Sequence, residues 1–94
     1  MATTSAGDLV RRIRERIREI PDFPRPGIGF KDVTPVLADA DLFSAVVARL
    51  VDGFARQGID RVVGIEARGF IFAAPVAVQL GAGFVPVRKP GKLP

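Results

Sequence analysis

Ninety-four residues, of which 48% are hydrophobic, are enough for one compact domain or for part of a larger one, and too apolar for a disordered tail. Because the chain contains no cysteine and no histidine, disulfides, the usual zinc sites and Ser-His-Asp catalysis are excluded. The formal net charge of +4, from 14 basic and 10 acidic residues, favours an anionic partner such as nucleic acid or a phosphorylated metabolite.

The aromatic residues narrow the choice of partner. All seven are phenylalanine in apolar or turn contexts, whereas proteins that bind single strands combine a continuous basic face with stacking aromatics. We therefore expect a small ligand and no nucleic acid.

No apolar stretch approaches the roughly 20 residues that a bilayer span needs, and residues 1–8 lack the order of a secretory signal. We expect no membrane contact and a cytoplasmic location.

Residues 1–20 carry the pattern of an amphipathic helix. Ser5, with Asp8 three positions later, resembles a capping box, and Pro21 predicts that the helix ends near Glu19. One face is apolar and the other basic, with Leu9, Val10, Ile13, Ile17 and Ile20 opposite Arg11, Arg12, Arg14, Arg16 and Arg18. The basic face is either a surface for RNA or membranes or a solvated face with Glu/Arg pairs. The second interpretation is favoured because exposed pairs need no partner.

Residues 21–35 predict an ordered loop. Prolines and glycines forbid a regular helix there, yet apolar side chains continue through the segment. Prolines also restrict the backbone, unlike the Gly/Ser composition of a flexible linker. Phe30, between Gly29 and Lys31, either stacks on a planar base whose edge the backbone binds or packs into the core, and composition alone favours core packing.

Residues 39–88 predict a helix followed by a β-α-β unit. Asp39 or Asp41 caps a helix over 40–57 that ends before Gly58. A strand over 61–66, a helix over 69–80, a turn over 81–83 and a strand over 84–88 follow. We expect an α/β fold, part of a parallel sheet with flanking helices, with ligands beyond the carboxyl ends of the strands. Pro75 predicts a kink or a helix that begins a turn late.

The turn between the first of these strands and its helix, Glu66-Ala67-Arg68-Gly69, has the composition of an anion site. Free backbone N–H groups, the positive end of a helix dipole, a guanidinium and a glycine that admits a close ligand meet there. Many strand-to-helix turns contain Arg and Gly for capping or solubility, so the pattern by itself favours a structural role.

Three motifs follow one another along the chain. They are Pro-Asp-Phe-Pro-Arg-Pro-Gly-Ile-Gly-Phe-Lys-Asp-Val-Thr-Pro at 21–35, Glu-Ala-Arg-Gly-Phe at 66–70 and Val-Arg-Lys-Pro-Gly-Lys-Leu-Pro at 87–94. In this order they resemble adenine phosphoribosyltransferases, which are type I phosphoribosyltransferases. The resemblance covers the chain from Arg12 onward but only the N-terminal half of the family's protein, so we interpret 1–94 as the N-terminal portion of a single phosphoribosyltransferase domain.

The resemblance implies a role in purine salvage. Enzymes of this family transfer phosphoribosyl from phosphoribosyl pyrophosphate, with Mg²⁺, to adenine and release AMP and pyrophosphate. It implies that 21–35 is a base-binding loop whose adenine-holding residues are Gly29, Phe30 and Lys31. It implies a pyrophosphate site, often with a non-proline cis peptide, made by Glu66, Ala67, Arg68, Gly69, Arg88 and Lys92. Residues 89–94 would begin a mobile loop, and the full-length form is expected to be a homodimer.

The sequence also departs from the family. Gly29 is smaller than the residue expected at that position. The phosphoribosyl-binding signature, a strand with two acidic residues and a Thr-Gly-Gly-Thr-like loop, is absent, and the loop glutamate with a catalytic role would fall after Pro94. We predict no catalytic residue and no direct metal ligand in this chain, and no activity from it alone. Glu66 keeps three possible roles: to orient the turn, to bond Arg68, or to influence Mg²⁺ through water.

Two other functions stay open at this point. A phosphoribosyltransferase for another purine, xanthine or guanine, would keep the pyrophosphate turn and change the base loop. A non-catalytic regulator that senses a purine or phosphoribosyl pyrophosphate would keep the ligand pocket and carry an effector module in the missing half.

Overall fold

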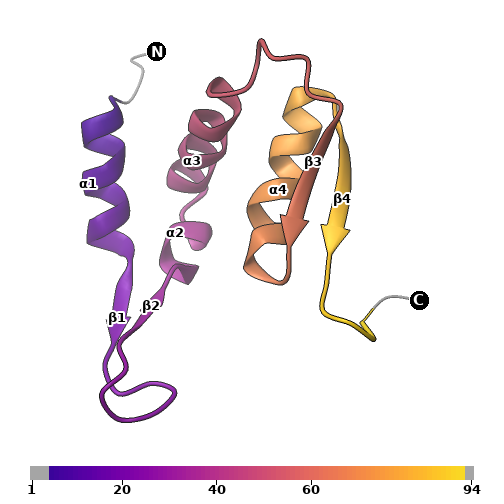
Figure 1. Ribbon diagram of the computed structural model, residues 1–94. Coiled ribbons are helices and arrows are strands. Elements are labelled where there is room, and N and C mark those ends of the chain that lie inside the picture. Colours follow the sequence, from indigo (N-terminus) through magenta and orange to yellow (C-terminus); the bar gives the residue numbers. More distant parts are fainter. Residues whose placement is uncertain (1–4, 93–94) are drawn as a thin grey trace. The chain divides into compact units, whose positions relative to one another are not determined.

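The structure is a computed structural model that describes residues 5–92, and the chain divides after Val46 into two compact units. The first unit holds α1 (Ala6–Arg16), β1 (Arg18–Ile20), β2 (Phe30–Asp32) and α2 (Thr34–Ala38); α3 (Ala40–Asp52) crosses the division; the second unit holds β3 (Arg61–Ile65), α4 (Arg68–Leu80) and β4 (Gly83–Val87) (Figure 1). The predicted α/β class is confirmed, with a parallel strand pair in the second unit.

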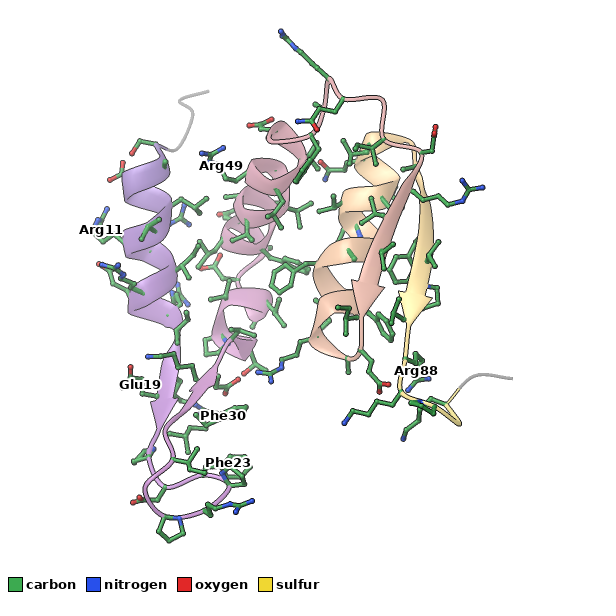
Figure 2. All side chains as sticks on the ribbon, in the orientation of Figure 1. Arg11, Glu19, Phe23, Phe30, Arg49 and Arg88 are labelled. Carbon is green, nitrogen blue, oxygen red and sulfur yellow. The ribbon has the colours of Figure 1, made fainter. Side chains whose placement is uncertain are left out.

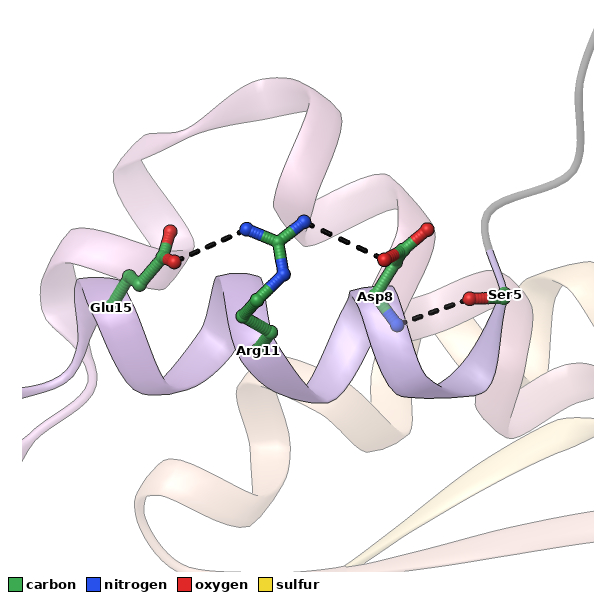
Figure 3. Close-up of polar contacts among 4 residues, drawn as sticks. All are labelled: Ser5, Asp8, Arg11 and Glu15. Carbon is green, nitrogen blue, oxygen red and sulfur yellow. Dashed lines mark hydrogen bonds and ion pairs between the residues drawn. The ribbon is translucent and has the colours of Figure 1, made fainter.

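Helix α1 begins where the sequence predicts. The Ser5 hydroxyl oxygen accepts the Asp8 N–H at 3.1 Å, which satisfies one of the free donors of the first turn. Figure 3 shows the Arg11 guanidinium between two carboxylates, 3.5 Å from Asp8 and 3.2 Å from Glu15. Arg16 is 2.9 Å from Asp39 in the same unit. These partners favour a solvated face with ion pairs over a surface for RNA or membranes.

The predicted end of α1 near Glu19 is wrong. The helix ends at Arg16, Ile17 is extended, and β1 pairs antiparallel with β2, so that Ile20 faces Phe30. Ile17 and Ile20 follow Ile13 at helical spacing, so the apolar pattern continues past the end of the helix. In the structure Ile17 is extended and Ile20 lies in a strand, so their spacing does not reflect a helix. The buried core of the unit is formed by Leu9, Val36 and Leu42, with Ile13, Ile17, Ala45 and Val46 packed around it.

The predicted loop over 21–35 is ordered but shorter than expected. Residues 21–29 join the two strands, with the Gly27 N–H donated to Asp22 at 2.9 Å and the Phe23 N–H to the Ile28 carbonyl at 2.9 Å. Its C-terminal part is strand β2 and the start of α2, with Pro35 in the first turn of that helix. Proline is tolerated in a first turn, where its missing N–H has no helical partner, so the exclusion of helix from the whole segment was too broad.

Helix α3 is capped as predicted and ends earlier. The Asp39 carboxylate accepts the Leu42 N–H at 3.0 Å, which identifies Asp39 as the cap. The helix ends at Asp52 rather than near Gln57, because Gly53 has low helix propensity and tight turns replace the helix after it. Gly58, at a φ of 63°, adopts the left-handed conformation in the connection to β3 instead of closing α3.

The β-α-β unit is confirmed, with small shifts in its bounds. Strand β3 ends at Ile65, α4 begins at Arg68, and β4 runs parallel to β3 with Val63 facing Val85. Gly81, at a φ of 68°, ends α4 and donates its N–H to the preceding turn. Helix α4 (Figure 1) begins at Arg68 and includes Pro75, so a late start is wrong, and a kink at Pro75 stays a prediction.

A glycine in β3 allows α4 to pack on the sheet. A Cβ on Gly64 would lie 2.7 Å from the Phe84 ring and 2.8 Å from Ala73 in α4, closer than carbon atoms can approach. Side chains alternate along a strand, so Val63 and Ile65 point to the opposite face of the sheet, where they are 58% and 66% exposed.

None of the helices over residues 5–92 is long and apolar enough to cross a membrane.

Candidate functional site

The three predicted base-binding residues line one hollow on the hairpin of the first unit. The hollow has a volume of about 320 Å³ and is lined by Glu19, Ile20, Pro21, Gly29, Phe30 and Lys31. Antiparallel pairing of β1 with β2 forms its walls, because Glu19 faces Lys31 and Ile20 faces Phe30 in the register. The sequence analysis predicted Gly29, Phe30 and Lys31 but not Glu19, Ile20 and Pro21. The strand pairing that brings the two sets together joins residues 10 to 14 positions apart.

Phe30 is half-buried at this hollow. Its ring makes an edge contact with Phe23, with centroids 5.2 Å apart and planes at 69° (Figure 2). The buried core of the unit is formed by other residues, from α1, α2 and α3. Phe30 lines the hollow and is not one of those core residues, so its placement fits contact with a ligand better than a role in filling the core. Its role as a base-binding residue stays a prediction.

An ion pair crosses the hairpin at the hollow. The Lys31 ammonium lies 2.6 Å from a Glu19 carboxylate oxygen, and both side chains are exposed. The hydrogen bond and the positive charge of Lys31 lower the pKa of Glu19 below its ordinary value. The wall of the hollow therefore carries two side chains of opposite charge in contact.

Asp32, which the sequence analysis passed over, holds the hairpin to α2. Its side chain is 12% exposed, and its carboxylate accepts the Thr34 N–H at 2.9 Å and lies 2.6 Å from the Arg18 guanidinium. The hydrogen bonds from Thr34, and then Arg18, hold the pKa of Asp32 below its ordinary value. An Asp two residues before a Thr-Pro helix start is typical of a side chain that bonds the backbone of a turn, and that signal could have found it.

The predicted anion turn lies at the carboxyl end of β3 in the second unit. Ala67 precedes α4 without a side-chain cap, so the N–H groups of the first helical turn have no capping side chain. The peptide bond between Glu66 and Ala67 is cis, as the family resemblance implied. A helix N-terminus without a side-chain cap next to Arg68 has the physical properties of an anion site.

Glu66 and Arg88 lie together at the carboxyl ends of the two parallel strands. The Glu66 N–H donates to the Val87 carbonyl at 3.0 Å, and its carboxylate accepts the Lys89 N–H. The Arg88 guanidinium is 3.7 Å from the other carboxylate oxygen and 5.9 Å from the centre of the Phe70 ring (Figure 2 labels Arg88). The contacts of Glu66 join residues more than 20 positions apart, which is why sequence reasoning left the role of Glu66 open.

Gly69 and Lys92 occupy different settings. A Cβ on Gly69 would meet only ordinary contacts, at 3.8 and 3.9 Å, so packing of the described residues does not demand glycine there. Lys92 lies in a turn after β4, with its N–H donated to the Lys89 carbonyl at 3.2 Å. Leu93 and Pro94 lie outside the described residues, and mobility of the loop over 89–94 stays a prediction. Within residues 5–92, no three acidic side chains gather as a metal site.

No protein-family model matches the chain. A curated adenine phosphoribosyltransferase from Acidothermus cellulolyticus is 60% identical over 87 residues, which is 93% of this chain and 49% of that protein. One from Myxococcus xanthus is 57% identical over 86 residues, 92% of this chain and 47% of that protein. The chain is a homologue of adenine phosphoribosyltransferases. It spans about half the length of these curated relatives.

A solved adenine phosphoribosyltransferase gives the same result for the fold. The crystal structure from Thermoanaerobacter pseudethanolicus is 54% identical, with a TM-score of 0.83 over 90% of this chain and 51% of that chain. The α/β architecture of this chain is therefore that of the adenine phosphoribosyltransferases over about half of their length.

Proposed function

We propose that this chain supplies the adenine-binding and pyrophosphate-binding parts of a purine-salvage enzyme that makes AMP and pyrophosphate from adenine and phosphoribosyl pyrophosphate. The observation that carries the proposal is the anion turn itself. An uncapped helix N-terminus, Arg68 and Arg88 lie at the carboxyl ends of two parallel strands, in a chain that is 60% identical to an adenine phosphoribosyltransferase.

The chemistry of the turn suits a leaving pyrophosphate. Displacement at the ribose C1 passes through an oxocarbenium-like state in which the leaving oxygen gains negative charge. Fixed donors at that oxygen stabilise the transition state more than the ground state, because the charge they meet is larger there. Arg68 and the N–H groups of α4 supply such donors, and Gly69 leaves room for an oxygen to approach the backbone.

The hollow on the hairpin suits a planar base. Phe30 offers an aromatic face, and the backbone of Gly29 and Lys31 offers groups for the edge of the base. A relative from Saccharomyces cerevisiae, 38% identical with a TM-score of 0.83, was solved with adenine, and the match covers 94% of this chain and 54% of that one. Adenine is accordingly the base that we assign to the hollow.

Further parts of the proposal rest on the family alone. Mg²⁺ would enter with phosphoribosyl pyrophosphate and neutralise its oxygens. The whole protein would act as a homodimer in the cytoplasm. The parts that bind the 5′-phosphate and the ribose would come from a segment corresponding to the half of the relatives that this chain does not match.

The test is AMP formation by a chimera of this chain with the unmatched part of the Acidothermus cellulolyticus relative. We expect turnover of adenine and phosphoribosyl pyrophosphate with Mg²⁺ by the chimera, and none by the 94 residues alone. Competition with xanthine and guanine checks the base, and adenine should be used first. Robust AMP formation by the 94 residues alone, or a chimera that folds and prefers another purine, would contradict the proposal.

A further inference from the structure

The role of the Glu66 carboxylate follows from where the structure places it. It stands directly after β3, on the turn proposed to bind pyrophosphate, and its side chain is only 15% exposed. Removing a carboxylate from water is unfavourable unless hydrogen bonds or opposite charges replace the water. Glu66 must therefore be held by its neighbours, and these neighbours show what it does.

Its partners are consecutive residues at the end of the neighbouring strand. The backbone N–H of Glu66 donates to the Val87 carbonyl at 3.0 Å and continues the parallel pairing of β3 with β4 by one residue. One carboxylate oxygen accepts the Lys89 N–H, and the other is 3.7 Å from the Arg88 guanidinium. Backbone and side chain of one residue thus hold residues 87–89 against the anion turn.

The contact with Arg88 leaves that side chain able to bind another anion. At 3.7 Å the pair attracts through charge but is too long for a hydrogen bond, so Glu66 does not use up the guanidinium donors. The same guanidinium is 5.9 Å from the Phe70 ring centre, in the first turn of α4, and 34% of the side chain is exposed. Arg88 is therefore held between a carboxylate and an aromatic ring with its donors available.

We propose that Glu66 is a positioning residue that acts through Arg88 and the Lys89 N–H to hold the basic segment 88–92 at the anion turn. The identity of the anion, pyrophosphate, rests on the function proposed above; the contacts within the turn do not. Two opposing effects follow. The negative charge of Glu66 repels an anion, whereas its contacts keep Arg88 in place for one.

The two effects can be separated with conservative and truncating variants. Glu66→Gln removes the charge but keeps an oxygen that accepts the Lys89 N–H, whereas Glu66→Ala removes both. If Glu66 positions the segment, Glu66→Ala binds pyrophosphate more weakly than the unchanged chain and Glu66→Gln binds it equally well or better. If charge alone mattered, both variants would bind pyrophosphate more tightly.

The experiment is ¹⁵N NMR of the 94-residue chain, with two readouts. Amide hydrogen exchange of Lys89 without ligand reports on the contact itself, and titration with inorganic pyrophosphate, with and without Mg²⁺, reports on the site. We expect Glu66→Ala to raise Lys89 exchange about tenfold and to weaken pyrophosphate binding about fivefold. Asp60→Ala, which removes an exposed carboxylate beside the other end of β3, is the matched control and should change neither readout.

A double variant shows whether Glu66 acts through Arg88. Once Arg88→Ala has weakened pyrophosphate binding, adding Glu66→Ala should weaken it little further, because effects that pass through one group do not add. The proposal is overturned if Lys89 exchange is unchanged in Glu66→Ala, if that variant binds pyrophosphate as tightly as the unchanged chain, or if the two losses add in full. A loss by Glu66→Ala that appears only with Mg²⁺ would also overturn it and assign Glu66 to the metal. If the unchanged chain binds no pyrophosphate, the proposed function loses its anion site, while Lys89 exchange still decides whether Glu66 holds the segment.

Discussion

The hairpin of the first unit and the β-α-β turn of the second hold their candidate ligand residues by different means. On the hairpin, side-chain contacts add to the pairing of β1 with β2: Arg18 contacts Asp32, Lys31 contacts Glu19, and Phe23 packs against Phe30. In the second unit, strand pairing, a helix N-terminus and close packing at Gly64 shape the turn. A planar base presents a face and an edge to side chains and backbone, whereas an anion needs converging donors that do not move.

The largest effect is expected where backbone packing is tightest. Gly64→Ala places a methyl group 2.7 Å from the Phe84 ring and should destabilise the second unit by about 1–3 kcal/mol, the usual cost of overpacking. Gly69→Ala is the matched control, since its methyl group meets only ordinary contacts. Urea unfolding followed through residues of β3 and β4 measures both. Equal loss of stability in the two variants would contradict the packing argument.

The next largest effect is expected at the anion turn of the second unit and should leave binding of the base largely unchanged. Arg68→Ala in the active chimera should raise KM for phosphoribosyl pyrophosphate about tenfold or more, because a charge-assisted contact to the pyrophosphate is lost. KM for adenine should change much less. Arg56→Ala, an exposed arginine after α3, serves as the control. Unchanged kinetics for phosphoribosyl pyrophosphate would remove Arg68 from the site.

A substitution in the hairpin of the first unit should have the opposite selectivity and affect adenine more than phosphoribosyl pyrophosphate. Phe30→Ala should raise KM for adenine about fivefold to tenfold, since base stacking on an aromatic ring contributes on the order of 1–3 kcal/mol in nucleic-acid complexes. KM for phosphoribosyl pyrophosphate should stay close to its original value. Phe30→Tyr keeps the ring and should behave like the unchanged protein. If the alanine variant loses stability without any change in KM, Phe30 is a packing residue, as composition alone had favoured.

The smallest effect is a dependence on pH at the hairpin, through Asp32. Folding lowers the pKa of Asp32 below its ordinary value of 3.8, so its contribution to stability is present above that value and is lost as the pH falls through the lower folded value. The Thr34 amide, which donates to Asp32, is the reporter for NMR. Asp32→Asn should flatten the pH response of that amide.

Sequence reasoning succeeded where local chemistry decides the structure. The Ser5 cap and the turn over 81–83 were predicted, and Asp39 was one of two candidate caps; each depends on residues within one helical turn. The β-α-β order followed from apolar runs between glycines. The family resemblance supplied the nature of the ligands, which no local pattern could give.

The parts that sequence reasoning missed depend on residues distant in the chain. Strands β1 and β2 have three residues each, too few for a periodic pattern, and their pairing joins residues 10 to 14 positions apart, such as Arg18 and Asp32. The need for glycine at position 64 comes from the Phe84 ring and Ala73, which the fold brings next to it from other elements. The contacts of Glu66 with Arg88 and Lys89 likewise require the parallel pairing before they can be seen.

The sheet of the second unit also has a consequence for handling the chain in solution. Val63, Ile65, Val85 and Val87 share one face, all are exposed, and both strands of this two-stranded sheet have one unpaired edge among the described residues. Parallel strands are normally covered on both faces, and an uncovered β-branched surface next to an open edge is a template for further strands. We therefore expect the purified chain to self-associate as its concentration rises, although its net charge of +4 favours solubility.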